Sequence, residues 1–194
     1  MLDFKTIIGV AAVALTFIGY IPYFRDIFNG KTTPHLFSWF IWILTSAIIY
    51  ALQVASGAGP GAWVTLSLVI IMTSVFVASL KKGDRDIKKI DIVFLIVALL
   101  ALPLWLIVKQ PILSIIILTT IDLIGFLPTI RKSWNRPRSE TLSFYLITTF
   151  RHSISVLALR NYNIVTALYP VAWVAANAIF SVILIIRRRK ITQN

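Results

Sequence analysis

The stretch IGYIPYFRDIFNGKTTPHLFSW (residues 18–39) aligns without a gap on IGFLPTIRKSWNRPRSETLSFY (residues 124–145), and this match decides the fold. Identical residues occupy six positions: Ile18/Ile124, Gly19/Gly125, Pro22/Pro128, Arg25/Arg131, Asn29/Asn135 and Leu36/Leu142. A second match, PGAWV (60–64) over PVAWV (170–174), follows at an offset of 110 residues, against 106 for the first. Two matches in the same order indicate that one structural unit occurs twice in the chain.

The residues around both copies are apolar enough for a lipid bilayer. Of the 194 residues, 58% are hydrophobic and only 13% are charged. Apolar runs of roughly 20 residues are long enough to cross the hydrocarbon core as helices. Seven such runs occur, at residues 6–24, 35–54, 61–80, 91–108, 111–130, 141–159 and 164–186. The sequence therefore predicts a multi-pass integral membrane protein with seven transmembrane helices.

The first three spans form one copy, the last three form the other, and the span at 91–108 links them. Because the linker crosses the bilayer once, both copies have the same orientation, which is the parallel type of repeat found in transporters. The predicted fold is all-α, with two parallel three-helix repeats joined by a linker helix. The corresponding units are residues 1–80, the linker with its flanking loops at 81–110, and residues 111–194, which end in a basic tail.

The basic residues indicate the orientation of the chain. It has 19 Lys and Arg against seven acids, a net charge of +12. The loops after the first, third and fifth spans and the tail hold most of the cations, whereas the opposite side has only Lys5, Lys109 and Arg160. By the positive-inside rule, the N-terminus is outside and the C-terminus is cytoplasmic. We interpret the excess of basic residues as a topology signal, and we expect these residues also to bind anionic lipid headgroups. We predict no nucleic-acid partner.

Several function classes find no support in the sequence. The chain has no cysteine, and its two histidines and seven acids form no recognisable metal-ligand cluster. We recognise neither an activated nucleophile nor a nucleotide-binding loop. The sequence therefore predicts a protein that is not an enzyme and that needs no metal or cofactor.

Three strongly polar side chains interrupt the last repeat at one depth. At 1.5 Å per residue, Asp122 and Asn177 lie roughly 13 Å from the cytoplasmic ends of their spans, and Arg151 lies roughly 15 Å from the end of its own. These depths are close to the middle of a ~30 Å hydrocarbon core. A charge there costs at least ~2.5 kcal/mol, and such residues commonly face a bundle interior or a water-filled cavity. We predict that all three bind substrate.

The first repeat offers weaker counterparts of these residues. The 106-residue offset places Thr45 opposite Arg151, and the 110-residue offset places Ser67 opposite Asn177. Trp42 lies deeper in its span than Trp39 and could stack on a ring of the solute. Thr45, Ser67 and Trp42 complete the predicted substrate site. The remaining aromatics near span ends are interpreted as belt or packing residues: Trp63, Trp134, Trp173 and Tyr169.

The two charges have a second interpretation. Asp122 and Arg151 could form a closed ion pair that holds their helices together without touching substrate. If they serve the transport cycle, Asp122 and the neighbouring His152 are the candidate proton-coupling groups, because histidine changes charge near physiological pH. A hydrogen bond to a neighbouring group is the simpler role for His152.

The matched prolines also have two interpretations. A proline inside a helix removes a backbone hydrogen bond and leaves a weak point. Pro22 and Pro128 then give each repeat a hinge at the same depth. The alternative is that each proline only ends its helix near the membrane interface.

The 3+1+3 arrangement, with a proline near the cytoplasmic end of the first helix of each repeat and a basic, Ser/Thr-containing loop after it, resembles the PQ-loop superfamily. That superfamily includes the SWEET sugar facilitators, cystinosin-like amino acid exporters, Pnu-type vitamin-precursor transporters and, more remotely, the KDEL receptor. The residues after the prolines are Tyr23 and Thr129, where the family pattern has Gln. The resemblance implies alternating access, with the paired prolines letting the two halves rock. In SWEET-like proteins an asparagine on the third helix of the repeat holds substrate, which corresponds to Asn177.

The sequence thus predicts a transporter that moves a small polar solute by alternating access through a midplane site. The solute is an amino acid, a sugar or a vitamin precursor, and an arginine near a carboxylate favours a zwitterion over a neutral sugar. The alternative is a KDEL-receptor-like protein that binds a ligand without net transport, and a third possibility is a membrane scaffold with a structural polar cluster. We expect the lipid bilayer as a partner and a monomer or homo-oligomer as the assembly.

Overall fold

The computed structural model describes residues 3–30, 34, 36–82, 89–135, 137, 140 and 142–192. These residues form seven α-helices and one short 3₁₀ turn, so the all-α class and the helix count are confirmed. The elements are α1 (Phe4–Phe28), α2 (Leu36–Ala55), η1 (Gly59–Ala62), α3 (Trp63–Lys82), α4 (Lys89–Leu106), α5 (Pro111–Asn135), α6 (Leu142–Leu157) and α7 (Ile164–Thr192). Each predicted span is helical, and α5 and α7 continue past the apolar runs into polar sequence.

Short polar residues fix the ends of two helices. Asp3 is the N-cap of α1, where its Oδ1 accepts from the Thr6 amide at 2.7 Å. The Thr6 hydrogen bonds, followed by the Arg160 charge, hold the pKa of the Asp3 carboxyl below its ordinary value. Before α7, Asn163 Oδ1 accepts from the Thr166 amide and Thr166 Oγ1 accepts from the Asn163 amide, both at 3.1 Å. This reciprocal pair satisfies two amides that would otherwise lack partners at the helix start.

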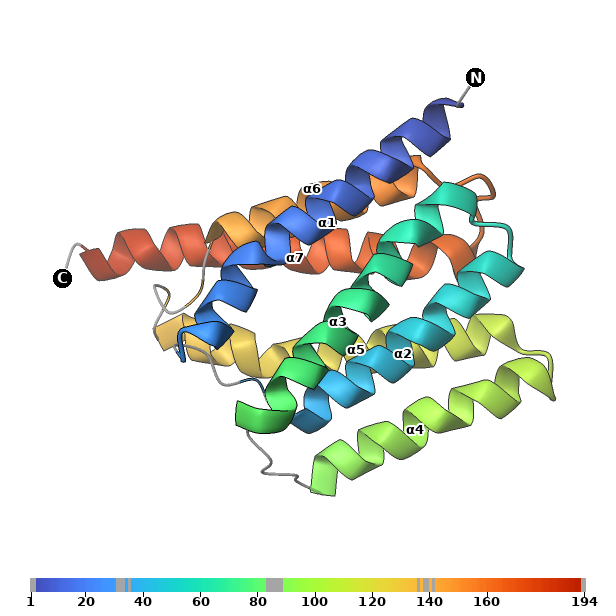
Figure 1. Ribbon diagram of the computed structural model, residues 1–194, viewed down its shortest axis with the longest axis horizontal. Helices are drawn as coiled ribbons and strands as arrows, with labels where there is room; N and C mark the ends of the chain where they lie inside the picture. The colour runs from blue at the N-terminus through green and yellow to red at the C-terminus, as the bar shows by residue number, and fades with distance from the viewer. Residues whose placement is uncertain are drawn as a thin grey trace.

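We call α1–α3 the first group and α5–α7 the second group, after the two predicted repeats, and α4 flanks them (Figure 1). In the first group, α3 packs against both α1 and α2; in the second, α7 packs against both α5 and α6. The groups meet where α1 packs on α6 and where α2 packs on α5 and α7. Helix α4 packs on α5 and α2 and lies along the edge of the molecule.

Apolar side chains form the core and also cover much of the surface, whereas several polar and charged side chains are buried. Many large apolar side chains are exposed, among them Ile96 on α4 and Ile179 on α7, whereas Asp122, Arg151 and His152 are buried. Within the described residues, three helical segments are long and apolar enough to cross a membrane: Phe4–Phe28, Gly59–Lys81 and Ile164–Lys190. Shorter apolar segments lie in α2, α4 and α5.

The repeat prolines lie inside their helices. Helix α1 continues past Pro22 to Phe28, and the backbone of α5 remains helical through position 128 to Asn135. The interpretation that these prolines end their helices is therefore wrong. The second sequence match behaves differently in its two copies, because Pro60 belongs to the η1 turn whereas Pro170 lies within α7.

Candidate functional site

Asp122 projects from α5 into the contact between the two groups. It is only 2% exposed, and its polar neighbours are the hydroxyl groups of Thr45 on α2 and Tyr169 on α7. Its Oδ1 atom has no hydrogen-bond partner. A buried carboxylate oxygen without a partner is energetically costly, which marks Asp122 as a position with unused binding capacity.

Arg151 lies across the other contact between the groups. It projects from α6 and is 4% exposed, and its guanidinium carbon lies 5.6 Å from the centre of the Tyr20 ring on α1. The ring face attracts the cation, and this interaction is stronger when both groups are removed from water. The Nε atom has no hydrogen-bond partner. Arg151 therefore retains a donor for a further group.

Asp122 and Arg151 do not form the ion pair that the sequence allowed. Among the described residues, ion pairs join Arg25 to Asp26 and Arg160 to Asp3, and none joins Asp122 to Arg151. The two opposite charges are thus buried without neutralising each other directly. A closed, purely structural pair does not account for them in this conformation.

Tyr169 has both charges in its neighbourhood, and its ring packs against that of His152. The two rings are 6.2 Å apart and nearly perpendicular, and the Ser46 hydroxyl of α2 is a further neighbour of Tyr169. His152 is 2% exposed, and its Nδ1 has no hydrogen-bond partner. Together these residues make a buried polar group that we call the central cluster: Tyr20, Thr45, Ser46, Asp122, Arg151, His152 and Tyr169. It takes residues from five helices and crosses the contact between the two groups.

Two other predicted site residues bond within their own helices. The Asn177 amide nitrogen donates to the Trp173 carbonyl at 2.8 Å, and the Ser67 hydroxyl donates to the Trp63 carbonyl at 2.8 Å. Asn177 follows Tyr169 by eight residues, about 12 Å along a helix. The α7 residue beside Asp122 is therefore Tyr169. Asn177 therefore bonds to its own helix in this structure, and its role in solute binding stays a prediction.

Trp42 marks the closest approach of α2 to α5. A Cβ atom on Gly125 would lie 3.4 Å from the Trp42 Nε1, so the absence of a side chain at 125 lets the indole reach the α5 backbone. Trp42 also packs edge-on against Trp39 at 5.3 Å. Its position one turn from Thr45 keeps it beside the central cluster, and its role in binding stays a prediction.

The sequence did not identify the tyrosines of the cluster. Tyr169 was interpreted as a belt or packing residue because it lies near the start of its apolar run, yet it is 2% exposed and touches both His152 and the neighbourhood of Asp122. Its membership depends on how α7 packs against α5 and α6, for which the sequence carries no signal. Tyr20 had a weak signal, since it pairs with Phe126 in the repeat and differs from it only by a hydroxyl.

A separate cavity of about 790 Å³ opens at one end of the bundle. Its lining comes from the turn after α2, the start of α5 and the loop before α7: Ala55, Ser56, Gly57, Pro111, Ile112, Asn161, Asn163, Ile164 and Val165. None of the central-cluster residues lines it. In the part of the chain that the structure describes, no three His, Cys, Asp or Glu side chains gather at a metal-binding distance.

Comparison of the chain with protein-family models, with curated proteins and with solved structures found no match. Function is therefore inferred from the geometry of the site.

Proposed function

We propose that the protein is a seven-pass membrane transporter that moves a small polar solute by alternating access, with its solute site at the central cluster. The first and second groups are the two moving halves, and α4 is the linker. The N-terminus is outside and the C-terminus is cytoplasmic. In this proposal the chain is a PQ-loop-like protein with a parallel 3+1+3 repeat.

The burial of two unpaired opposite charges between the halves carries this proposal. Removing an isolated charge from water is expensive unless a partner compensates, and apolar packing would stabilise the helices at lower cost. Asp122 and Arg151 each retain an unused atom, and both lie in the neighbourhood of Tyr169. A solute with both a cationic and an anionic group would satisfy both residues at once. Among the candidate solutes, an amino acid fits this arrangement better than a sugar.

The packing of the matched glycines supports the repeat. At Gly19 of α1, the nearest side chain to an added Cβ is Ile147 of α6, at 3.5 Å; at Gly125 of α5, it is Trp42 of α2, at 3.4 Å. Each glycine is thus approached by the second helix of the opposite group. This reciprocity is what a two-fold relationship between the groups produces. It also explains why small residues occupy both positions, since close helix contacts in membranes favour them.

The exposed apolar surface supports seven spans. Helix α4 alone exposes Ile92, Val93, Ile96, Leu99 and Leu100. A soluble monomer rarely exposes contiguous apolar surface on this scale, whereas a bilayer requires it. The shorter apolar segments of α2 and α5 pack on the long helices α3 and α7, and that of α4 packs on α2 and α5, so all three fit the same layer.

We assign proton coupling to Asp122 and His152 because both are buried in the contact that alternating access would rearrange. A proton can drive the cycle only if its affinity differs between the two conformations. The expected result is that Asp122→Asn removes the dependence of uptake on a pH gradient while solute exchange at equilibrium continues.

A thermal-shift screen of the purified protein tests the site. Sugars, amino acids and vitamin precursors are compared, since a ligand that binds the folded state raises Tm by mass action. We expect an amino acid to raise Tm, and we expect Arg151→Gln to abolish that shift and Asp122→Asn to reduce it without removing it. Thr120→Val and Ser153→Ala are matched controls, because these hydroxyls lie on the same helices and bond only to their own helix backbone. A shift that persists undiminished in both charge variants would place the ligand elsewhere.

A further inference from the structure

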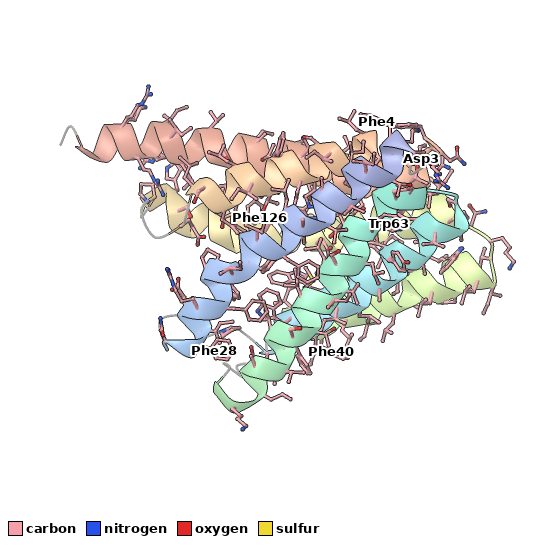
Figure 2. The ribbon with its side chains drawn as sticks, turned by 45° about the horizontal axis from the view of Figure 1, so that its top comes forward. Asp3, Phe4, Phe28, Phe40, Trp63 and Phe126 are labelled. Atoms are coloured by element: carbon pink, nitrogen blue, oxygen red, sulfur yellow. The ribbon has the colours of Figure 1, made fainter. Side chains whose placement is uncertain are left out.

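The loop between α6 and α7 is tied to the first turn of α1. Arg160 forms an ion pair with Asp3 at 2.6 Å, and Lys5 Nζ donates to the Leu159 carbonyl at 2.6 Å. The Lys5 ammonium also lies 5.2 Å from the centre of the Tyr162 ring. Figure 2 shows Asp3 and Phe4 at one extremity of the molecule, with Trp63 on the same side. These contacts join the first group to the second at that end.

The same loop is tied to the turn between α2 and η1. The Arg160 amide donates to the Ala58 carbonyl at 2.9 Å, and the Asn161 side chain donates to the Ser56 carbonyl at 3.0 Å. One turn into α6, the Ser155 hydroxyl donates to the Gly61 carbonyl at 2.7 Å. The loop therefore holds two separate elements of the first group.

The backbone of the turn is shaped for this contact. Gly59 has a φ of +63°, and an added Cβ would lie 2.7 Å from the Cγ and Cδ atoms of Arg160. The aliphatic stem of Arg160 thus packs directly on the glycine, and this packing aims the guanidinium at Asp3. The two oxygens of Asp3 have different partners, since Oδ1 caps α1 and Oδ2 receives Arg160.

At the opposite end, described hydrogen bonds connect neighbours within one group. Arg187 Nε donates to the Trp134 carbonyl at 2.8 Å, and Arg188 Nε donates to the Pro137 carbonyl at 3.0 Å, so both bonds join α7 to the end of α5 and the loop after it. The Arg25 and Asp26 pair lies within α1. These bonds move with their group when the groups move apart.

We propose that Asp3, Lys5, Leu159, Arg160, Asn161 and the Ser56–Ala58 turn form a latch that closes the end of the molecule where α1 begins. The structure is then the state closed toward the outside, and release of the latch opens the central cluster to that side. This inference rests on the proposed alternating access. The ion pair is about half exposed, so water replaces its bonds when it opens, and the net cost of each opening is small. A reversible closure needs contacts of this kind.

Cysteine accessibility tests the latch without requiring transport. The chain has no cysteine, so Ser155→Cys introduces a single thiol at a site that is 2% exposed and lies just behind the latch. In sealed vesicles, a membrane-impermeant maleimide is applied from the side of the N-terminus. The added pair Asp3→Asn and Arg160→Gln should accelerate labelling by about two- to fivefold, the effect expected when a half-exposed ion pair is lost. Asparagine at 3 still caps α1, so the helix start is preserved.

The controls use pairs and sites that the latch does not include. Replacing Arg25 by Gln and Asp26 by Asn removes an exposed ion pair that lies within α1 and should leave the labelling rate unchanged. Lys109→Cys, on an exposed turn, should label fast in every background. Asp3→Asn alone is nearly isosteric and should give a smaller acceleration in the same direction with an unchanged Tm.

Equal labelling rates with and without the latch substitutions, or equal acceleration by the Arg25 and Asp26 pair, would overturn the proposal. If no solute were transported, the proposal that the protein is a transporter would be refuted. The faster labelling of the latch variant would still show that the latch closes this end of the molecule.

Discussion

At the scale of single residues, two glycines allow the effect of backbone strain on stability to be distinguished from the effect of side-chain packing. Gly59 and Gly30 both have a left-handed backbone, with φ of +63° and +70°. A Cβ at Gly59 would collide with Arg160, whereas a Cβ at Gly30 would meet nothing within 4 Å. The two sites therefore differ in surroundings but hardly in backbone conformation.

Replacing each glycine by alanine should reveal this difference. Gly30→Ala should lower the free energy of unfolding by about 1–2 kcal/mol, the cost of a left-handed alanine. Gly59→Ala should lower it by a further ~1–3 kcal/mol, because Arg160 must move away from the added methyl. Thermal or denaturant unfolding of the two variants in detergent measures the difference. Equal losses would show that Arg160 does not depend on Gly59 for its position.

The two central charges give a second prediction at this scale. A closed ion pair would couple Asp122→Asn and Arg151→Gln by several kcal/mol, since removing one partner strands the other. Because no ion pair joins them, we expect the double variant to be nearly additive, with a coupling below about 1 kcal/mol. Unfolding of both single variants and the double variant supplies the cycle. Recovery of stability by the second substitution would restore the structural interpretation.

The charged part of the site could be predicted from sequence and its aromatic part could not. Asp122 and Arg151 stand out because a charged side chain within an apolar run is energetically costly and therefore usually has a function. Tyr169 gives no such signal, since a tyrosine in an apolar run fits a core, a membrane interface or a site equally well. The long-range packing of α7 on α6 brings it beside His152.

At the scale of helices, the sequence predicted the presence of each helix more accurately than the residues at which the helix ends. Each apolar run became a helix, because the 20-residue scale of the bilayer and the helical period agree. The ends of α5 and α7 were missed because hydropathy falls before the backbone hydrogen bonds stop.

The repeat prolines make a prediction about these helices. Because α1 and α5 remain helical through positions 22 and 128, Pro22→Ala and Pro128→Ala can each restore a backbone hydrogen bond without breaking a turn. The double variant should slow solute flux while binding and Tm change little. Pro103→Ala, inside α4 outside both groups, is the matched control and should leave flux unchanged. Normal flux in the double variant would remove the hinge assignment.

At the scale of the whole molecule, the two termini lie at opposite ends (Figure 1). The proposed seven crossings account for this, and the positive-inside rule predicts that the N-terminal end lies outside. The proposed latch lies at the N-terminal end, and the long basic end of α7 lies at the other.

Labelling from one side of the membrane checks this orientation. A bulky impermeant cysteine reagent applied outside should modify Lys109→Cys and should not modify Lys190→Cys, because the two sites lie on opposite sides of the bilayer. Both positions are exposed, so burial does not explain a difference between them. The reverse pattern would invert the topology and assign the latch to the cytoplasmic side.

Uptake into reconstituted liposomes tests the proposed function most directly. The labelled solute is the one that gives the largest thermal shift. We predict saturable, time-dependent accumulation by the wild type and by Thr120→Val, and loss of accumulation in both Asp122→Asn and Arg151→Gln when a pH gradient drives the uptake. Saturable binding without accumulation would contradict a transporter and favour a KDEL-receptor-like protein, whereas normal uptake by both charge variants would remove the central cluster from the solute path.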